Sequence, residues 1–303
     1  MSADGETGDG IDTNVVQSLV ARRMFDPDAE LYRIGRFAVL ERLGTGGMGV
    51  VYGAYDPELD RRVAVKLLFD DGDDGGRAAA VREAQAMARL ADPNVAAVYE
   101  VGIHKGRTFV AMQHVRGQNL RRWAQAQPRA LPEILAVYRQ AALGLAAAHE
   151  VGVVHRDFKP DNALVDDDGR VRVVDFGLAS IDAGLRTPSE AASLGDPEHE
   201  STDPLTARRG GGTPAYMAAE QFGGEPGDAR CDQFAWCVSL WEACVGARPF
   251  AGHDFASLVA AVRDDRILEP PPRRLPRWLA KLLRRGLAAE PGARYRDMRQ
   301  LVA

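Results

Sequence analysis

The pattern of apolar and polar residues predicts two parts with different secondary structure. In the first part, from Gly35 to Val115, short apolar runs alternate with turns, as is typical of strands. The stretch Arg77–Leu90 instead has a helical period. This part should therefore form a mostly antiparallel sheet with one helix. The predicted strands are Phe37–Leu43, Val50–Tyr55, Arg62–Leu68, Val95–Gly102 and Thr108–His114.

The second part follows the Gly117-Gln118 turn and has mainly helical periodicity. Leu131–Glu150 predicts a long amphipathic helix, and two short apolar runs at 163–165 and 171–174 predict a hairpin after it. The segment 234–245 is apolar on nearly every face, so its helix should run through the core. Further helices are expected near residues 229–246, 254–264, 276–288 and 294–302.

Three segments are expected to lie outside this core. Residues 1–12 are acidic and Gly-rich, which predicts disorder, and Thr13–Met24 fits a short amphipathic helix capped by Thr13. Ala179–Gly212 is rich in charged, hydroxyl, Gly and Pro residues, which predicts a long mobile loop.

Composition narrows the class of protein. With 303 residues, 46% of them apolar, the chain can bury one large core or two lobes that share a cleft. A net charge of −5 and arginines that look scattered disfavour nucleic-acid binding. No apolar run reaches about 18 residues, so these residues predict no membrane span and no signal peptide.

The cysteines Cys231, Cys237 and Cys244 fall in one predicted helix. Their spacing suits neither a disulfide framework nor a zinc site. We therefore expect buried, reduced thiols and a cytoplasmic protein.

A glycine-rich run, Gly44-Thr45-Gly46-Gly47-Met48-Gly49, lies between two predicted strands. Its glycines would let a hairpin turn close over phosphate groups with backbone N–H groups exposed. The same pattern fits a dinucleotide fold or a plain flexible turn. A strand follows here, whereas the dinucleotide fold needs a helix N-terminus for the pyrophosphate.

Lys66 ends the apolar strand that contains Val63, Ala64 and Val65, in a chain with only four lysines among 38 basic residues. A lysine on a strand is often a solvated edge residue. Here Glu83 follows on the predicted helix, where it could pair with the Lys66 amine. Such a pair would hold the amine against the α- and β-phosphates of a nucleotide.

Polar groups cluster after the long helix, in the run His155-Arg156-Asp157-Phe158-Lys159-Pro160-Asp161-Asn162. A loop between rigid elements suits these groups for chemistry better than for burial. Asp157 could orient an attacking hydroxyl and accept its proton, while Lys159 neutralises charge on a transferring phosphoryl group. An ordinary charged surface turn is the alternative.

Asp175-Phe176-Gly177 follows thirteen residues after Asn162 and argues against a plain surface turn. The Asp175 carboxylate and the Asn162 amide oxygen are hard ligands of the kind that Mg²⁺ prefers. Asn162 and Asp175 are therefore the candidate metal ligands.

These motifs, in this order, resemble those of the serine/threonine protein kinases of the eukaryotic (Hanks) type, most closely the bacterial branch. The resemblance covers roughly Tyr32 to the C-terminus and implies an α+β, bilobal protein kinase-like fold. A small antiparallel β-sheet lobe with one helix is expected at 32–115 and a larger, mainly helical lobe at 116–303. Residues 1–31 would be a partly disordered N-terminal extension.

The resemblance also implies roles for individual residues. Asp157 would be the catalytic base, and Lys66 and Glu83 the activating ion pair. Val51, Ala64 and Leu164 would sandwich the adenine, Met112 would be the gatekeeper, and residues 113–115 the hinge. The residues expected to bind ATP are Gly44, Thr45, Gly46, Gly47, Gly49, Val51, Ala64, Lys66, Met112, Gln113, Val115, Asn162, Leu164 and Asp175.

Further assignments follow from the same resemblance. Lys159, two residues after the catalytic Asp, distinguishes serine/threonine kinases from tyrosine kinases. Residues 212–217 resemble the substrate-docking loop, in which Thr213 would contact Asp157 and Lys159. Asp232 would anchor the catalytic loop to the buried helix, and Glu220 would pair with Arg294.

The chain departs from the family pattern in two places. Ala218-Ala219-Glu220 stands where Ala-Pro-Glu is usual, which removes the backbone restraint of the proline but keeps the carboxylate. Asp92 stands where a His is usual, which bears on packing more than on chemistry.

The segment between Asp175 and Glu220 suggests regulation. Arg156 beside the catalytic Asp is expected to pair with phosphate on this loop and order it after autophosphorylation. Thr206 is our first choice of acceptor. The candidate hydroxyls are Thr187, Ser189, Ser193, Ser201, Thr202 and Thr206.

The implied function is transfer of the γ-phosphoryl group of ATP to protein Ser/Thr hydroxyls in bacterial signalling, with Mg²⁺ or alternatively Mn²⁺. A dimer would serve trans-autophosphorylation. A pseudokinase that acts as a scaffold would lack an equivalent of Lys66, Asp157 or Asp175. A small-molecule kinase would lack the 212–220 segment. The chain has all of these features.

Overall fold

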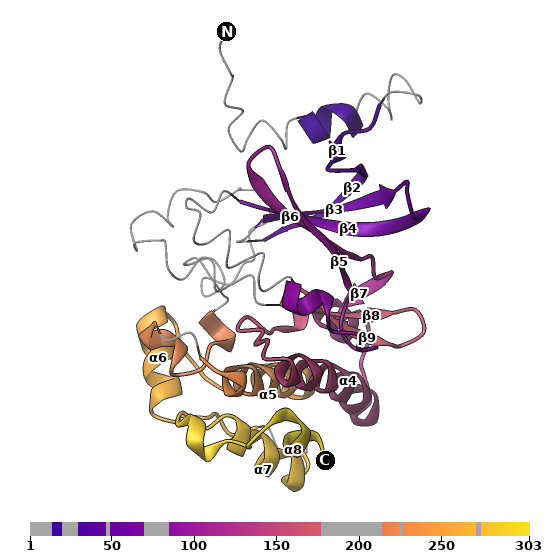
Figure 1. The fold of residues 1–303 in the computed structure, drawn as a ribbon. Coiled ribbons are helices and arrows are strands. Elements are labelled where there is room, and N and C mark those ends of the chain that lie inside the picture. The colour runs from indigo at the N-terminus through magenta and orange to yellow at the C-terminus, as the bar shows by residue number, and fades with distance from the viewer. Residues whose placement is uncertain are drawn as a thin grey trace. The chain divides into compact units, whose positions relative to one another are not determined.

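The computed structural model describes residues 14–19, 30–46, 49–69, 85–176, 214–224, 227–270 and 274–303. The chain divides into two compact units (Figure 1). Unit 1 comprises Met1–Ala88 with Ala97–His114, and unit 2 comprises Arg89–Ala96 with Val115–Ala303.

Unit 1 is built on a six-stranded antiparallel sheet in the order β1-β2-β3-β4-β6-β5. The predicted strands are confirmed to within a few residues, and a short β1 precedes them. The strands are β1 (Arg33–Ile34), β2 (Phe37–Gly46), β3 (Gly49–Asp56), β4 (Arg61–Leu68), β5 (Val98–His104) and β6 (Arg107–Gln113). Of the predicted helix 77–90, residues 85–90 are described; 85–88 are helical, and 89–90 are not.

The prediction that β5 begins at Val95 was wrong. Val95 and Ala96 belong to unit 2, where Val95 bridges Val173 and the Ala96 N–H donates to the Val173 carbonyl at 3.0 Å. Because their backbone groups are used there, these two residues do not extend the sheet of unit 1. Asp92 closes the preceding turn, since its Oδ1 accepts from the Asn94 N–H at 2.8 Å.

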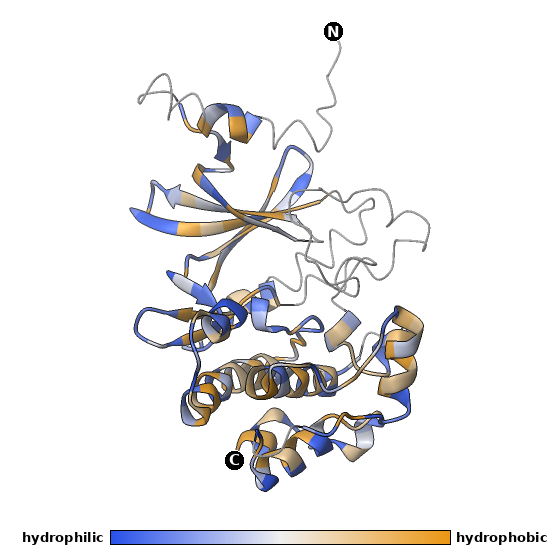
Figure 2. Cartoon of the chain, turned by 180° about the vertical axis from the view of Figure 1, so that it is seen from behind, coloured by the Kyte–Doolittle hydropathy of each residue, from blue (hydrophilic) through white to orange (hydrophobic). Residues whose placement is uncertain are grey.

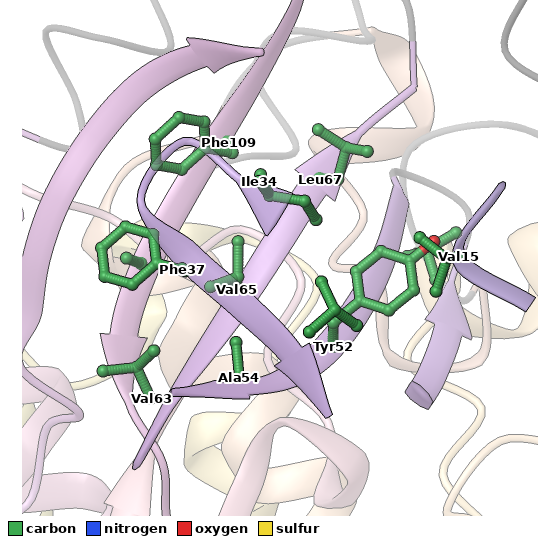
Figure 3. Packing of buried hydrophobic residues seen from close by; sticks show 12 residues of the cluster. Val15, Ile34, Phe37, Tyr52, Ala54, Val63, Val65, Leu67 and Phe109 are labelled. Carbon is green, nitrogen blue, oxygen red and sulfur yellow. The ribbon is translucent and has the colours of Figure 1, made fainter. Parts of the chain in front are cut away.

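The core of unit 1 covers one face of the sheet. Alternation along β4 turns Val63, Val65 and Leu67 to this face, where they join Tyr52 and other buried side chains (Figure 3). Residues 14–19 are helical and add Val15, which is 1% exposed, to the same cluster. A segment expected to precede the domain thus contributes to the core of this unit.

Gly49 opens β3 where the backbone of β4 comes close. A Cβ at this position would lie 2.3 Å from the Leu67 carbonyl oxygen, whereas one at Gly44, in the same hairpin, would meet nothing within 4 Å. We expect Gly49→Ala to lower the free energy of unfolding by about 1–3 kcal/mol, the usual cost of overpacking. Gly44→Ala is the matched control and should change it little. Thermal melts of both variants measure the difference, and equal melts would contradict it.

Unit 2 is mainly helical and carries a three-stranded sheet in the order β7-β8-β9. The strands are β7 (Gly117–Asn119), β8 (Ala163–Asp166) and β9 (Val171–Val173). The helices are α3 (Leu120–Ala126), α4 (Leu131–Glu150), α5 (Ala229–Val245), α6 (Phe255–Arg263), α7 (Arg277–Gly286) and α8 (Met298–Val302). The predicted hairpin and the long helix α4 are both confirmed.

Helix α5 runs through the core of unit 2, as predicted, and packs against α4 (Figure 2). Every residue from Cys231 to Trp241 is buried. The cysteines of α5 are buried and free of disulfides. Burial raises the pKa of all three thiols, that of Cys244 to about 12, so these thiols stay protonated at neutral pH.

The last helix is shorter than predicted. The sequence predicted a helix over 294–302, but α8 begins at Met298, where the Asp297 carboxylate accepts from the Gln300 N–H and caps the helix. A 3-10 turn at Pro291–Ala293 precedes it, and Arg294 has an extended backbone with its side chain drawn to Glu220. The prediction over-extended the helix because it did not recognise this cap.

Candidate active site

In unit 1, the glycine-rich run forms the end of the β2–β3 hairpin. Gly44 pairs with Val51, Thr45 with Val50, and Gly46 with Gly49 across the two strands. Gly47 lies outside the described residues. The run is therefore a hairpin turn between strands, the geometry expected for a loop that covers phosphates and not that of a dinucleotide fold.

The candidate nucleotide residues of unit 1 share the sheet face opposite its core. Val51 is the cross-strand partner of Lys66, and Ala64 is that of Met112. Directly paired residues point to the same face, and residues 64 and 66 alternate with the core residues of β4. Lys66 is 5% exposed, and the structure does not describe Glu83. One face thus gathers three apolar side chains and one buried amine.

Gln113 ends β6 with its N–H already engaged, since it donates to the Ala97 carbonyl at 2.8 Å. Of the backbone groups of this residue, the carbonyl is therefore the one left for a purine. The sequence did not predict this restriction.

In unit 2, the 155–162 loop closes around the Asp157 carboxylate. Lys159 Nζ donates to Asp157 Oδ2 at 2.8 Å, and the two side chains are 21% and 11% exposed. Asn162 Nδ2 donates to the Asp157 carbonyl at 2.8 Å and lies 3.5 Å from Asp157 Oδ2. The loop therefore holds one carboxylate and one ammonium together in a half-buried place.

Asp232 on α5 anchors this loop, as predicted. Its two carboxylate oxygens accept from the backbone N–H groups of His155 and Arg156, each at 2.7 Å, and from His149 Nε2 at 2.8 Å. Burial alone would raise the pKa of Asp232, but these donors hold it below its usual range. Arg156 takes a left-handed backbone conformation with φ of 64°, so the anchor fixes a strained turn.

His155 ties the loop to the strand that precedes Asp175. Its Nε2 lies 2.9 Å from the Val174 carbonyl, which can only accept, so Nε2 carries the proton. Nδ1 then accepts from the Asp157 N–H at 3.4 Å. The ring packs against Phe158 and Phe176. The two ring nitrogens thus join the Asp157 backbone to the strand that precedes Asp175.

Asp175 lies just beyond β9, which ends at Val173, one residue before the end of the predicted run 171–174. It is one of few non-Gly residues with positive φ, at 61°. The Val174 N–H donates to the Asn162 carbonyl at 2.9 Å, which brings the chain at Asp175 next to Asn162. Gly177 and Thr213 lie outside the described residues.

The oxygen atoms of Asn162 and Asp175 suit a cation that takes its remaining ligands from water or from substrate phosphates. Asn162 Nδ2 is turned to the Asp157 carbonyl, so its amide oxygen points away from that carbonyl. Within the described ranges, no three His, Cys, Asp or Glu side chains form a metal cluster. One carboxylate and one amide oxygen fit Mg²⁺, which keeps waters or binds substrate phosphates besides its protein ligands.

The comparisons with known proteins agree with this geometry. A family model described as protein kinase domain matches residues 37–303. The chain belongs to the protein kinase family. Within this family, use of ATP, of a divalent metal ion and of protein substrates is general.

Bacterial serine/threonine-protein kinases are among the curated relatives of this kinase domain. It is 35% identical over 271 residues to serine/threonine-protein kinase PknD of Mycobacterium tuberculosis, covering 87% of this chain and 38% of the relative. It is 33% identical over 268 residues to PknE of Mycobacterium bovis, covering 87% of this chain and 44% of the relative. The chain thus spans less than half the length of these relatives.

A solved structure supports the kinase fold. The crystal structure of a variant of the Mycobacterium tuberculosis PknI kinase domain is 26% identical, has a TM-score of 0.66, and covers 90% of this chain and 96% of that one. The predicted α+β kinase fold is confirmed. No helix in the part of the chain that the structure describes has the length and apolar character needed to cross a bilayer.

The ion pair between Glu220 and Arg294 keeps the family's usual carboxylate in place. Arg294 Nη1 and Nη2 donate to the two Glu220 oxygens at 2.7 and 2.9 Å, and the guanidinium is fully buried. Ala219, which replaces the usual proline, leaves this predicted contact intact.

Arg121 on α3 is a residue of the kinase domain that sequence reasoning missed. Its guanidinium contacts Asp161 in the 155–162 loop, donates to the Tyr216 hydroxyl at 2.7 Å, and lies 3.5 Å from Glu242. It joins the loop to the turn at 214–216 and to α5. The sequence offered no signal, since Arg121 is one arginine among many on a short helix.

Proposed function

We propose that this chain is a serine/threonine protein kinase that transfers the γ-phosphoryl group of ATP to Ser or Thr hydroxyls of proteins. One observation carries the proposal: the Asp157 carboxylate lies 2.8 Å from Lys159 Nζ in a half-buried loop fixed to α5. Phosphoryl transfer needs a carboxylate that accepts the proton of the hydroxyl and an ammonium that neutralises charge, and both must act at the same place.

In this proposal, Asp157 orients the substrate hydroxyl and accepts its proton. Lys159 neutralises charge on the transferring group and, by its position after Asp157, favours Ser or Thr over Tyr. Thr213 would contact both residues from the docking loop. The contact from Lys159 Nζ to Asp157 Oδ2 holds the carboxylate in one orientation, which supports a role as base.

We assign ATP binding to the residues that the family resemblance implies. In unit 1, Lys66 paired with Glu83 would hold the α- and β-phosphates beneath the glycine-rich hairpin. The adenine would contact Val51, Ala64, Met112 and Leu164, as the resemblance implies. Because the Gln113 N–H is engaged, the base would bond to the Gln113 carbonyl and the Val115 N–H.

Asn162 and Asp175 would hold Mg²⁺, with Mn²⁺ as an alternative because it accepts the same oxygen donors. When bound, the cation offsets the negative charge of the phosphates. Two features support this assignment. The Asn162 amide is oriented by its hydrogen bond to the Asp157 carbonyl, and Asp175 follows β9 in a left-handed backbone conformation.

We also propose the kinase domain as residues 32–303, with lobes at 32–115 and 116–303. Autophosphorylation in trans, within a dimer, would modify a hydroxyl between Asp175 and Glu220, Thr206 being the first candidate. A cytoplasmic location suits ATP as the donor. The supporting features are the hydroxyl-rich sequence of that segment and Arg156 beside the catalytic Asp.

Lys66→Met tests the nucleotide site with a matched control. Removing the amine should lower phosphoryl transfer to a generic basic protein by about 10²-fold or more, as for other preorganised charge-stabilising groups. Lys105→Met, which changes another of the four lysines on the β5–β6 turn, should leave transfer unchanged. Transfer of labelled γ-phosphate is the readout. Full activity of Lys66→Met would rule out the assigned role.

A further inference from the structure

The helix α7 carries a concentration of positive charge. Between residues 274 and 286 the chain has five basic residues and no acidic one, although its net charge is −5. The expectation that arginines are scattered therefore does not hold here. The basic residues of this stretch are Arg274, Arg277, Lys281, Arg284 and Arg285.

The two faces of α7 differ in what they contact. Leu279, Leu283 and Gly286 are buried, and α7 packs against α5, at the edge of unit 2 away from β7–β9 (Figure 1). Arg277 and Lys281 are four residues apart and therefore share the opposite, exposed face. We call Arg277, Trp278 and Lys281, together with the exposed Arg274 just before the helix, the outer face of α7.

The cations of the outer face are available to a partner. Arg284 is already paired with Glu269 at 2.7 Å, and Arg285 stacks on Tyr295 at 4.2 Å. The side chains of Arg274, Arg277 and Lys281 make no ion pair or hydrogen bond with any residue of the described ranges. Three charges on flexible stems thus extend into solvent from one short stretch.

Trp278 stands among these cations and is 57% exposed. The other tryptophans, Trp123, Trp236 and Trp241, are at most 9% exposed. Leu268, which precedes the Glu269 that pairs with Arg284, is a further exposed apolar residue, at 44%. A solvent-exposed tryptophan beside these basic side chains indicates a binding surface.

We propose that the outer face of α7 docks the kinase domain on an anionic membrane surface. A helix packed by its apolar face presents a convex strip, and a planar surface can meet every residue of such a strip at once. Basic side chains are attracted to acidic lipid headgroups, and tryptophan favours the headgroup level because its ring is apolar with one polar edge. The membrane is contacted from outside, without a spanning helix.

Sedimentation with lipid vesicles tests the proposal on the full chain. The chain should bind vesicles of phosphatidylcholine mixed with phosphatidylglycerol, and it should not bind vesicles of phosphatidylcholine alone. Binding should weaken as salt rises, because mobile ions screen exposed charges. The double variant Arg277→Glu with Lys281→Glu should bind roughly thirtyfold more weakly or worse, given the usual contribution of each cation near a lipid surface.

Matched variants distinguish binding through the outer face of α7 from a general effect of the net charge of the chain. Arg122→Glu with Arg139→Glu makes the same charge change on exposed positions of α3 and α4, and it should keep most of the binding. Trp278→Ala should lose the blue shift of tryptophan fluorescence on vesicles, whereas Leu59→Ala, at 58% exposure in unit 1, should retain it. Circular dichroism melts should be alike for all variants.

Three results would overturn the proposal. The first is equal binding to neutral and anionic vesicles, and the second is equal loss of binding in the α7 and the control charge variants. The third is salt-sensitive binding to polyglutamate or RNA without binding to phosphatidylglycerol, which would identify a macromolecular partner in place of a membrane.

Discussion

Asp157→Asn is expected to slow phosphoryl transfer by about 10²–10⁴-fold, the range that general-base catalysis contributes. The amide keeps the shape of the side chain but cannot accept the proton of the attacking hydroxyl. It also loses the charge that holds Lys159 Nζ at 2.8 Å, so the ammonium is no longer fixed. The initial rate of transfer at saturating ATP measures the effect.

Stability and nucleotide binding should survive this change. Asp157 is partly exposed, and its backbone carbonyl, which accepts from Asn162 Nδ2, is unaltered. Asp167→Asn is the matched control, because Asp167 is exposed in the β8–β9 turn close by in sequence. It should keep the wild-type rate. If Asp157→Asn kept that rate too, the carboxylate would not be the base.

Asp232→Ala is expected to lower the free energy of unfolding by about 3–5 kcal/mol, the usual cost of breaking a buried charged contact. The substitution leaves the buried N–H groups of His155 and Arg156, and the His149 ring, without their acceptor. Because those donors fix the 155–162 loop, phosphoryl transfer should fall as well. Chemical denaturation at neutral pH measures the loss, again against Asp167→Asn.

The same variant has a defined pH dependence. The pKa of Asp232 is lowered in the folded state, so the unfolded state binds the proton more readily. The contribution of Asp232 to stability is therefore fully present above the unfolded pKa, about 3.9, and is lost as pH falls through the folded pKa. Wild type and Asp232→Ala should thus become more alike in stability as pH drops below about 4. A difference that grows on acidification would contradict the anchor.

The contacts predicted best from sequence are those that lie close along the chain or follow from an ordered motif. Asp157, Lys159 and Asn162 fall within six residues, so one loop brings them together. The long helix α4 and the buried helix α5 were predictable because apolar periodicity and all-round apolarity depend on local sequence. The anchor at Asp232 and the pair of Glu220 with Arg294 could be predicted only through the family resemblance.

Other features of the fold and the site depend on contacts between residues that lie far apart in the sequence. The Gln113 N–H is used by Ala97, and β5 starts late because Val95 and Ala96 pair with β9. Arg121 gains its role from three separate segments, and no local pattern marks it. Val15 enters the core of unit 1 from a stretch whose sequence looked peripheral. Such contacts are tertiary, so neither propensity nor periodicity contains them.

The most direct test of the central claim is phosphoamino-acid analysis after incubating the purified chain with γ-labelled ATP, Mg²⁺ and three peptides that differ only in carrying Ser, Thr or Tyr. We predict label on the Ser and Thr peptides, none on the Tyr peptide, and loss of both signals with Asp157→Asn. Binding of ATP without label on any peptide, or label on Tyr alone, would contradict the claim.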